Sequence, residues 1–150
     1  MTDSLRPFLI KAASFCAYQE RTIGEVSEKL SEWGLDQNHI DDVVAELIAQ
    51  KYLNEARFVA SFVRGKFRHN HWGRIKIRHE LKNKGISNDL IMKGFDEIDD
   101  HEYETTLREI LDKKARTLKA DQPSVRKHKL VKYAQSKGFE TDLIWQIVGQ

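Results

Sequence analysis

The chain has 150 residues, of which 40% are hydrophobic and 32% are charged, and its formal net charge is +2. This length excludes a large multidomain enzyme, and the apolar fraction excludes wholesale disorder. Two prolines, eight glycines and charges spaced between apolar residues favour helices over a turn-dense β fold.

Membrane insertion and disulfide bonding are not expected. The longest stretches without Asp, Glu, Lys or Arg are eight residues, 12–19 and 143–150, and a bilayer span needs about 20 apolar residues. The N-terminal residues do not resemble an export signal, so we expect a cytoplasmic protein. The single cysteine, Cys16, excludes an internal disulfide framework and a multi-cysteine metal site.

The first 50 residues predict three helices. Apolar residues at helical spacing indicate a first helix over residues 4–18. Thr22 and Glu25 form a capping-box pattern that predicts the start of a second helix. This helix is expected to end at Gly34, with Leu35 folding back as the apolar partner of a Schellman cap. A third helix then follows and ends near Gln50.

The pattern around Gly34 returns twice, at Gly85 and Gly138. Five positions at fixed offsets from each glycine stay apolar in all three copies. They are Val26, Leu30, Leu35, Ile40 and Val44 in the first copy, Ile77, Leu81, Ile86, Ile91 and Phe95 in the second, and Leu130, Ala134, Phe139, Ile144 and Val148 in the third. Such self-similarity is typical of a repeat protein, and we expect a positive φ at each glycine.

Each copy also has a leading apolar helix, which gives three helices per repeat. We therefore predict an all-α protein of nine helices in three tandem three-helix repeats, over residues 1–50, 51–98 and 99–150. Units of this kind stack on their neighbours, so an elongated curved body is expected.

The small net charge conceals four charge blocks. Residues 1–50 carry four basic and nine acidic side chains, whereas residues 51–85 carry ten basic and two acidic ones. Residues 96–112 carry one basic and eight acidic side chains, and residues 113–137 carry nine basic and one acidic. Two blocks of net +8 indicate an anionic partner, although solvated helix faces would produce the same pattern.

The basic residues of these blocks are the predicted partner-binding site. In the first block, several of them recur at helical spacing, and only Glu55 and Glu80 supply compensating acids within it. We therefore expect the arginines of the two helices to project as columns into solvent. The predicted site residues are Arg57, Arg64, Lys66, Arg68, Arg74, Lys76, Arg78, Lys82, Lys113, Lys114, Arg116, Arg126, Lys127, Lys129 and Lys132.

Catalytic chemistry has no candidate motif in this sequence. It contains no phosphate-binding glycine loop ending in Lys-Ser or Lys-Thr and no nucleophile with evident partners. His69 and His71 are the nearest approach to a metal motif, and we interpret them as residues of an interhelix loop. We therefore expect no catalytic residue, no cofactor and no metal.

Several motifs resemble those of the RecX family, bacterial regulators of the RecA recombinase. Residues 19–22 with Glu25-Val26 and Lys29-Leu30 resemble its first repeat, and the segment Tyr52–Phe58 (YLNEARF) resembles the opening of its second. Gly73, Ile77, Glu80-Leu81 and Lys84-Gly85-Ile86 are similar to a further family series at the same spacings.

The resemblance implies a non-enzymatic regulator that lies in the groove of the RecA filament on single-stranded DNA. It implies inhibition of the ATPase, strand-exchange and coprotease activities, and hence a role in DNA repair, recombination and the SOS response. We expect a monomer that also binds bare DNA weakly and without sequence preference.

Two alternatives remain open at this point. The segment Ser27–Val44 resembles a helix-turn-helix, so direct DNA binding is one. Asp36, Asp41 and Asp42 would then face the DNA phosphates. This repulsion argues against the first repeat as the element that recognises the bases. The other is a helical adaptor for an acidic protein unrelated to recombination.

Overall fold

The computed structural model describes residues 2–149, which form nine α-helices and one short 3-10 helix. The elements are α1 Arg6–Tyr18, α2 Ile23–Glu32, α3 Gln37–Ala49, α4 Glu55–Asn70, α5 Arg74–Asn83, α6 Asn88–Gly94, η1 Phe95–Glu97, α7 Asp100–Arg116, α8 Pro123–Ser136 and α9 Thr141–Val148. The described residues contain no strand, so the all-α prediction is confirmed.

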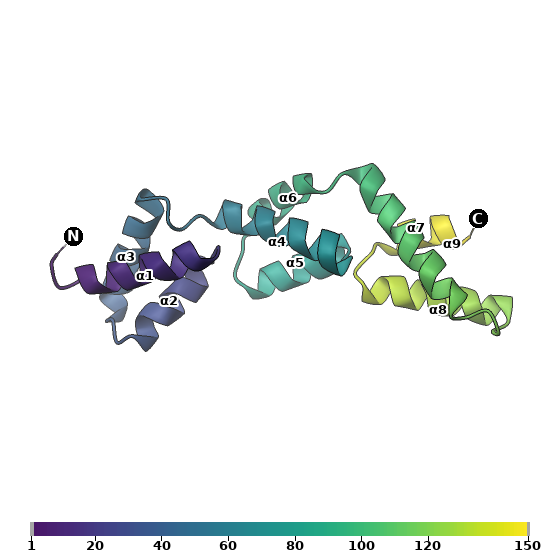
Figure 1. The fold of residues 1–150 in the computed structure, drawn as a ribbon, viewed down its shortest axis with the longest axis horizontal. Helices are drawn as coiled ribbons and strands as arrows, with labels where there is room; N and C mark the ends of the chain where they lie inside the picture. The colour runs from purple at the N-terminus through teal and green to yellow at the C-terminus, as the bar shows by residue number, and fades with distance from the viewer. Residues whose placement is uncertain (1, 150) are drawn as a thin grey trace.

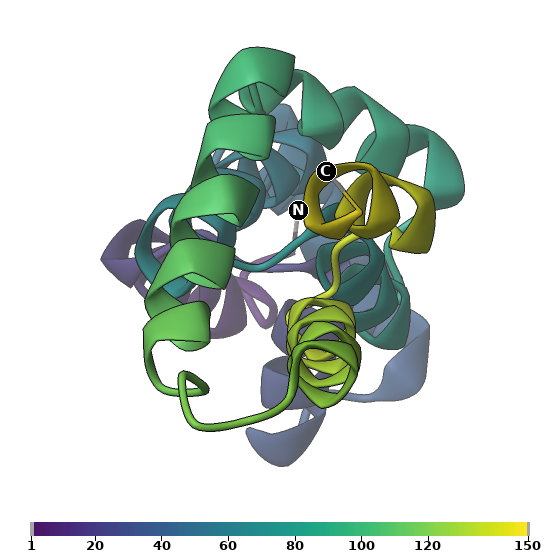
Figure 2. The same ribbon diagram turned by 90° about the vertical axis from the view of Figure 1, so that its right-hand side faces the viewer.

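The helices form three consecutive groups along one long axis (Figure 1). We call α1–α3 unit one, α4–α6 with η1 unit two, and α7–α9 unit three. Figure 2 looks along this axis, with α7, α8 and α9 nearest the viewer and unit one behind them. None of the described helices combines the length and apolar character that crossing a membrane requires.

Local polar residues explain where most of the helices begin. A side-chain oxygen of the residue preceding the helix accepts a hydrogen bond from a backbone N–H of the first turn, which otherwise has no partner. This arrangement occurs at Thr22, Asp36, Asn54, Ser87 and Asp99. The predicted start of the second helix is confirmed, because Thr22 Oγ1 accepts from the Glu25 N–H at 3.0 Å.

Glycine ends the second helix of each unit, as predicted. The φ angles of Gly34, Gly85 and Gly138 are 91°, 81° and 95°. The next residue's N–H returns to the last turn each time, for example from Leu35 to the Leu30 carbonyl at 3.0 Å. Equivalent bonds run from the Ile86 N–H to the Leu81 carbonyl and from the Phe139 N–H to the Ala134 carbonyl. These are Schellman caps, and the apolar residue after each glycine is buried.

The repeated apolar positions form the core, with one shift in the third unit. All five positions are buried in units one and two. In unit three, Leu130 and Val148 are only partly buried, and Val131 is buried beside Leu130. Relative to α2 and α5, the α8 helix is therefore rotated about its own axis, so that Val131 faces the core.

Two hydrophobic cores divide the chain unequally. Unit one has its own core, which ends with Leu53. Units two and three share a single core, which extends from Phe58 to Ile144. Phe67, Tyr103 and Phe139 join the two units within it, with Tyr103 centred 5.7 Å from Phe67 and 5.0 Å from Phe139.

Of the two histidines predicted to lie in an interhelix loop, only His71 lies outside a helix. His69 belongs to the last turn of α4, and His71 is its C-terminal cap in the left-handed conformation, with φ 56°. The interpretation of His69 as a loop residue was therefore wrong. The left-handed position at this helix end is occupied by His71 and not by a glycine.

Candidate functional site

The predicted arginine columns do not project freely into solvent. Arg57 is ion-paired with Glu20, and Arg64 is ion-paired with Glu97. Both carboxylates lie outside the basic block of residues 51–85, so counting acids within that block did not reveal them. The expectation of uncompensated columns was wrong for these arginines, because the chain brings distant carboxylates to them.

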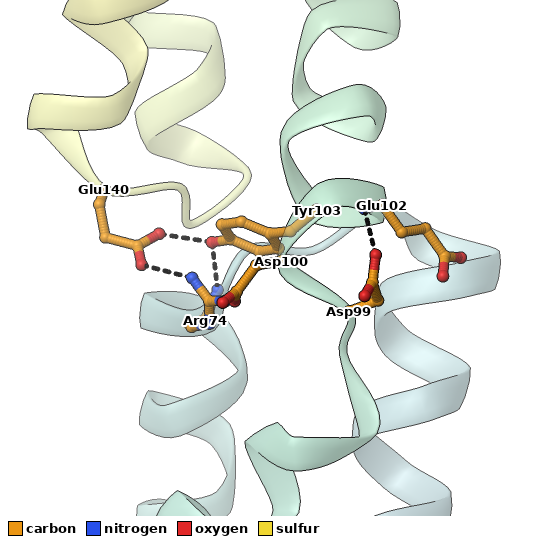
Figure 3. Close-up of polar contacts among 6 residues, drawn as sticks. All are labelled: Arg74, Asp99, Asp100, Glu102, Tyr103 and Glu140. Atoms are coloured by element: carbon orange, nitrogen blue, oxygen red, sulfur yellow. Dashed lines mark hydrogen bonds and ion pairs between the residues drawn. The ribbon is translucent and has the colours of Figure 1, made fainter.

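Arg74 is the most strongly engaged of the predicted site residues (Figure 3). Its guanidinium pairs with Asp100 at 2.8 Å and with Glu140 at 3.2 Å, and its side chain is only 24% exposed. The guanidinium carbon also lies 4.0 Å from the centre of the Tyr103 ring. Arg74 therefore connects α5 to α7 and to the segment before α9.

Tyr103 completes this junction network. Its hydroxyl accepts a hydrogen bond from the Arg74 backbone N–H at 2.9 Å and donates one to the Glu140 carboxylate at 2.5 Å, as Figure 3 shows. Burial and the hydrogen bond to Glu140 raise the pKa of Tyr103 well above its ordinary value. The phenol therefore stays protonated and donates at physiological pH. Nearby, Asp99 caps α7 by accepting the Glu102 N–H at 2.9 Å.

A groove of about 610 Å³ lies on the arginine side of units two and three. Arg68, Arg74 and Arg78 share its lining with five carboxylates, which come from residues 96–102. The Arg78 Nε atom is buried without a hydrogen-bond partner, and its guanidinium contacts Met92 Sδ at 3.4 Å. This groove is of mixed charge and offers no uniform attraction to an anion.

Lys66 and Lys76 of the same two helices lie on the other side. Residues 64 and 66 are about 200° apart around a helix axis, as are residues 74 and 76. Lys66 and Lys76 both contact Trp72, with their Nζ atoms 4.8 Å and 4.6 Å from a ring centre. Neither has an ion pair within residues 2–149. On these two helices Arg57, Arg64 and Arg74 are therefore ion-paired, whereas Lys66 and Lys76 on the other side are not.

The second basic block is mostly unpaired. Lys129 is ion-paired with Asp121 at 3.0 Å, and Arg126 donates to the Ala115 carbonyl at 3.3 Å. Among residues 2–149, eleven predicted site residues lack an ion pair with a carboxylate. They are Lys66, Arg68, Lys76, Arg78, Lys82, Lys113, Lys114, Arg116, Arg126, Lys127 and Lys132.

Three residues of this region were not predicted. Tyr103 and Glu140 hold Arg74, and Lys137 donates from Nζ to the Asn70 carbonyl at 2.8 Å. Lys137 precedes the Gly138 cap inside a basic block, and this was the one signal that could have identified it. Nothing in the local sequence connects Tyr103 to Glu140.

Neither a cluster of metal ligands nor an exposed cysteine occurs among the described residues. Within residues 2–149 no group of three or more His, Cys, Asp or Glu side chains could hold a metal ion. The Cys16 thiol is buried, and this burial raises its pKa, so the thiolate is disfavoured.

Three family models match the chain in succession. They are the first, second and third three-helix domains of RecX, and they match residues 10–47, 54–93 and 102–148. The chain belongs to the RecX family. The RecX resemblance and the repeat fold predicted from the sequence are thereby confirmed.

Curated RecX relatives are similar over nearly the whole chain. Proteins named "Regulatory protein RecX" from Leuconostoc mesenteroides and Lactobacillus johnsonii are 28% and 30% identical over 141 and 140 residues. The matches cover 94% and 93% of this chain but 53% and 51% of the relatives. The chain therefore spans about half the length of these curated relatives.

Solved RecX structures share the fold. The crystal structure of RecX from Lactobacillus salivarius aligns with a TM-score of 0.91 at 23% identity, covering 99% of this chain and 97% of that one. A second crystal structure of regulatory protein RecX aligns with a TM-score of 0.85 at 21% identity, covering 98% and 74%. The arrangement of nine helices is thus that of RecX proteins.

Proposed function

We propose that this chain regulates the RecA recombinase by binding the RecA filament on single-stranded DNA through its unpaired basic side chains. Binding there inhibits the ATPase, strand-exchange and coprotease activities of the filament, and so limits recombinational repair and the SOS response. Membership of the RecX family and the names of its regulatory relatives support this function.

One observation carries the choice of surface. Arg57, Arg64 and Arg74 pair with the chain's own carboxylates, whereas Lys82 on α5 and Lys127 and Lys132 on α8 are exposed and lack such partners within residues 2–149. An anionic partner does not have to displace an existing ion pair to reach these lysines. They therefore offer long-range attraction at little structural cost.

The row of three units suits an extended partner. A body whose repeats follow one axis, as in Figure 1, presents side chains from several units to one elongated groove. The chain then acts by occupying the filament, with no covalent chemistry of its own.

A charge-reversal experiment tests the proposal. The triple variant with Lys82→Glu, Lys127→Glu and Lys132→Glu is expected to lose co-sedimentation with RecA filaments and inhibition of their ATPase. The matched control carries Lys84→Glu, Lys93→Glu and Lys119→Glu, which change the net charge equally at exposed positions outside the predicted site. Circular dichroism verifies that both variants fold. Full inhibition by the folded first variant would refute this surface.

The helix-turn-helix alternative gains no support from the third helices of units one and two. In unit two, α6 has only seven residues, and the Ser87 hydroxyl at its start already accepts a hydrogen bond from the Leu90 N–H at 3.3 Å. In unit one, Asp36 caps α3 and places a carboxylate at its start. Preferential binding of one duplex sequence over the RecA filament would nevertheless favour this alternative over our proposal.

A further inference from the structure

A small pocket lies where units two and three meet, on the lysine side of the molecule. Its volume is about 240 Å³. The C-terminal ends of α4, α7 and α8 supply most of its lining. The lining residues are His71, Ile110, Lys113, Lys114, Thr117, Tyr133 and Lys137.

The pocket lining carries positive charge and no negative charge. Lys113, Lys114 and Lys137 contribute three ammonium groups, and no carboxylate lines the pocket. Two of them contact neutral groups: Lys137 Nζ donates to the Asn70 carbonyl at 2.8 Å, and Lys114 Nζ lies 5.0 Å from the centre of the Tyr133 ring. The pocket therefore gathers positive charge without an anion from residues 2–149.

The helix ends around the pocket offset only part of this charge. The C-terminus of a helix carries a partial charge of roughly −0.5, so three ends neutralise about half of three ammonium groups. Burial lowers the pKa of Lys137, and the nearby ammonium group of Lys76 lowers it further. An anion in the pocket would offset the repulsion between these ammonium groups.

We propose that this pocket binds a phosphate group. The lining supplies what phosphate recognition requires, namely several ammonium donors together with the hydroxyl of Tyr133, whereas the Thr117 hydroxyl donates to the Lys114 carbonyl at 2.7 Å. A phosphate group reaches the pocket either within a nucleic-acid backbone or on a free nucleotide. This site goes beyond the proposed function, because it binds its ligand without RecA.

The surroundings favour a strand over an isolated phosphate. Positive charge continues from Lys137 to Lys76, and Lys76 and Lys66 both contact the partly buried Trp72. Cations beside an aromatic ring are typical of surfaces that follow a single-stranded backbone. The pocket would then hold one phosphate while Lys76 and Lys66 approach its neighbours.

Titrations without RecA test this site. Inorganic phosphate, ATP and a fluorescein-labelled oligodeoxythymidylate are added separately to the whole chain. Phosphate is expected to shift the NMR signals of His71, Thr117 and Tyr133 before those of unit one. If ATP binds more tightly than the oligonucleotide, the phosphate comes from a free nucleotide. The opposite order identifies a strand.

Substitutions at the pocket give the decisive comparison. Lys113→Gln with Lys114→Gln, and separately Lys137→Gln, should each weaken the favoured ligand about tenfold, because charge-assisted hydrogen bonds are lost. For a single strand the log–log salt slope should also fall by about 0.7 per lost phosphate contact. Lys84→Gln with Lys93→Gln is the matched control and should bind as the unmodified chain does.

Unchanged affinity and salt slope in both pocket variants would overturn the phosphate site. Because RecA is absent from these titrations, that result would leave the proposed regulation of RecA standing. Conversely, normal phosphate binding together with failure of the charge-reversal experiment on filaments would remove the RecA surface and retain the pocket.

Discussion

Gly73→Ala is expected to separate units two and three. Gly73 has an ordinary backbone conformation, with φ −80° and ψ 171°, so any residue could adopt it. A side chain is excluded because a Cβ atom there would lie 2.3 Å from the Gly138 carbonyl oxygen and 2.5 Å from the Phe139 nitrogen. These are backbone atoms, which cannot rotate away as a side chain can.

The cost can be estimated from the contacts that would be lost. Two hydrogen bonds cross the junction here, from Gly73 N–H to the Lys137 carbonyl at 2.7 Å and from Ile75 N–H to the Gly138 carbonyl at 3.0 Å. Each contributes about 1 kcal/mol to stability, and overpacking costs about 1–3 kcal/mol. We expect a loss of about 3–5 kcal/mol in the free energy of unfolding.

Thermal melts and hydrogen exchange measure this effect. A loss of 3 kcal/mol corresponds to a melting temperature lower by about 6–12 °C for a chain of this size. Amide protection should fall first around Phe139, because the core shared by units two and three opens. Unit one has a separate core and should keep its protection.

Gly65→Ala is the matched control for this prediction. Gly65 lies within α4, and an added Cβ atom would meet nothing within 4 Å. Alanine should therefore stabilise the helix by about 0.5–1 kcal/mol. A Gly73→Ala variant that melts within about 1 °C of the unmodified protein would refute the close-contact argument.

Four further predictions concern the junction network, a glycine in the core and a surface ion pair. Tyr103→Phe should cost about 1–3 kcal/mol in chemical denaturation, because Glu140 and the Arg74 N–H lose a partner. Since folding raises the pKa of Tyr103, the unfolded state releases the proton more readily, and stability should fall by about 1.4 kcal/mol per pH unit above about pH 10; Tyr103→Phe should show a shallower slope. Gly94→Ala should cost about 1–3 kcal/mol, since its Cβ would lie 2.4 Å from Val59 Cγ1, and an unchanged melting temperature would contradict this. A double-mutant cycle on Arg57 and Glu20 should give about 0.2–1 kcal/mol because the pair is partly exposed, and a coupling of several kcal/mol would show this estimate to be wrong.

The helices and their ends could be predicted because their causes are local. Thr22 lies three residues from Glu25, whose N–H it accepts, and Gly34 ends its helix through bonds within one turn. The fixed offsets from three such glycines then disclosed the repeat. At the end of α4, where His71 and not a glycine occupies the left-handed position, the loop was predicted to begin at His69, two residues too early.

The register of the third repeat could not be predicted from apolar offsets alone. Leu130 and Val131 are both apolar, so either could face the core. Packing of α8 against the other helices buries Val131 and leaves Leu130 partly exposed. The choice depends on the rotation of a whole helix, which no short sequence pattern specifies.

By itself, the sequence determined an all-α repeat chain with a RecX pattern and two basic blocks. Only the tertiary structure decided which basic residues are unpaired. The carboxylates that pair with Arg57, Arg64 and Arg74 include residues 37, 33 and 66 positions away. Coulomb attraction depends on distance in space, and folding alone brings such residues within a few ångströms of one another.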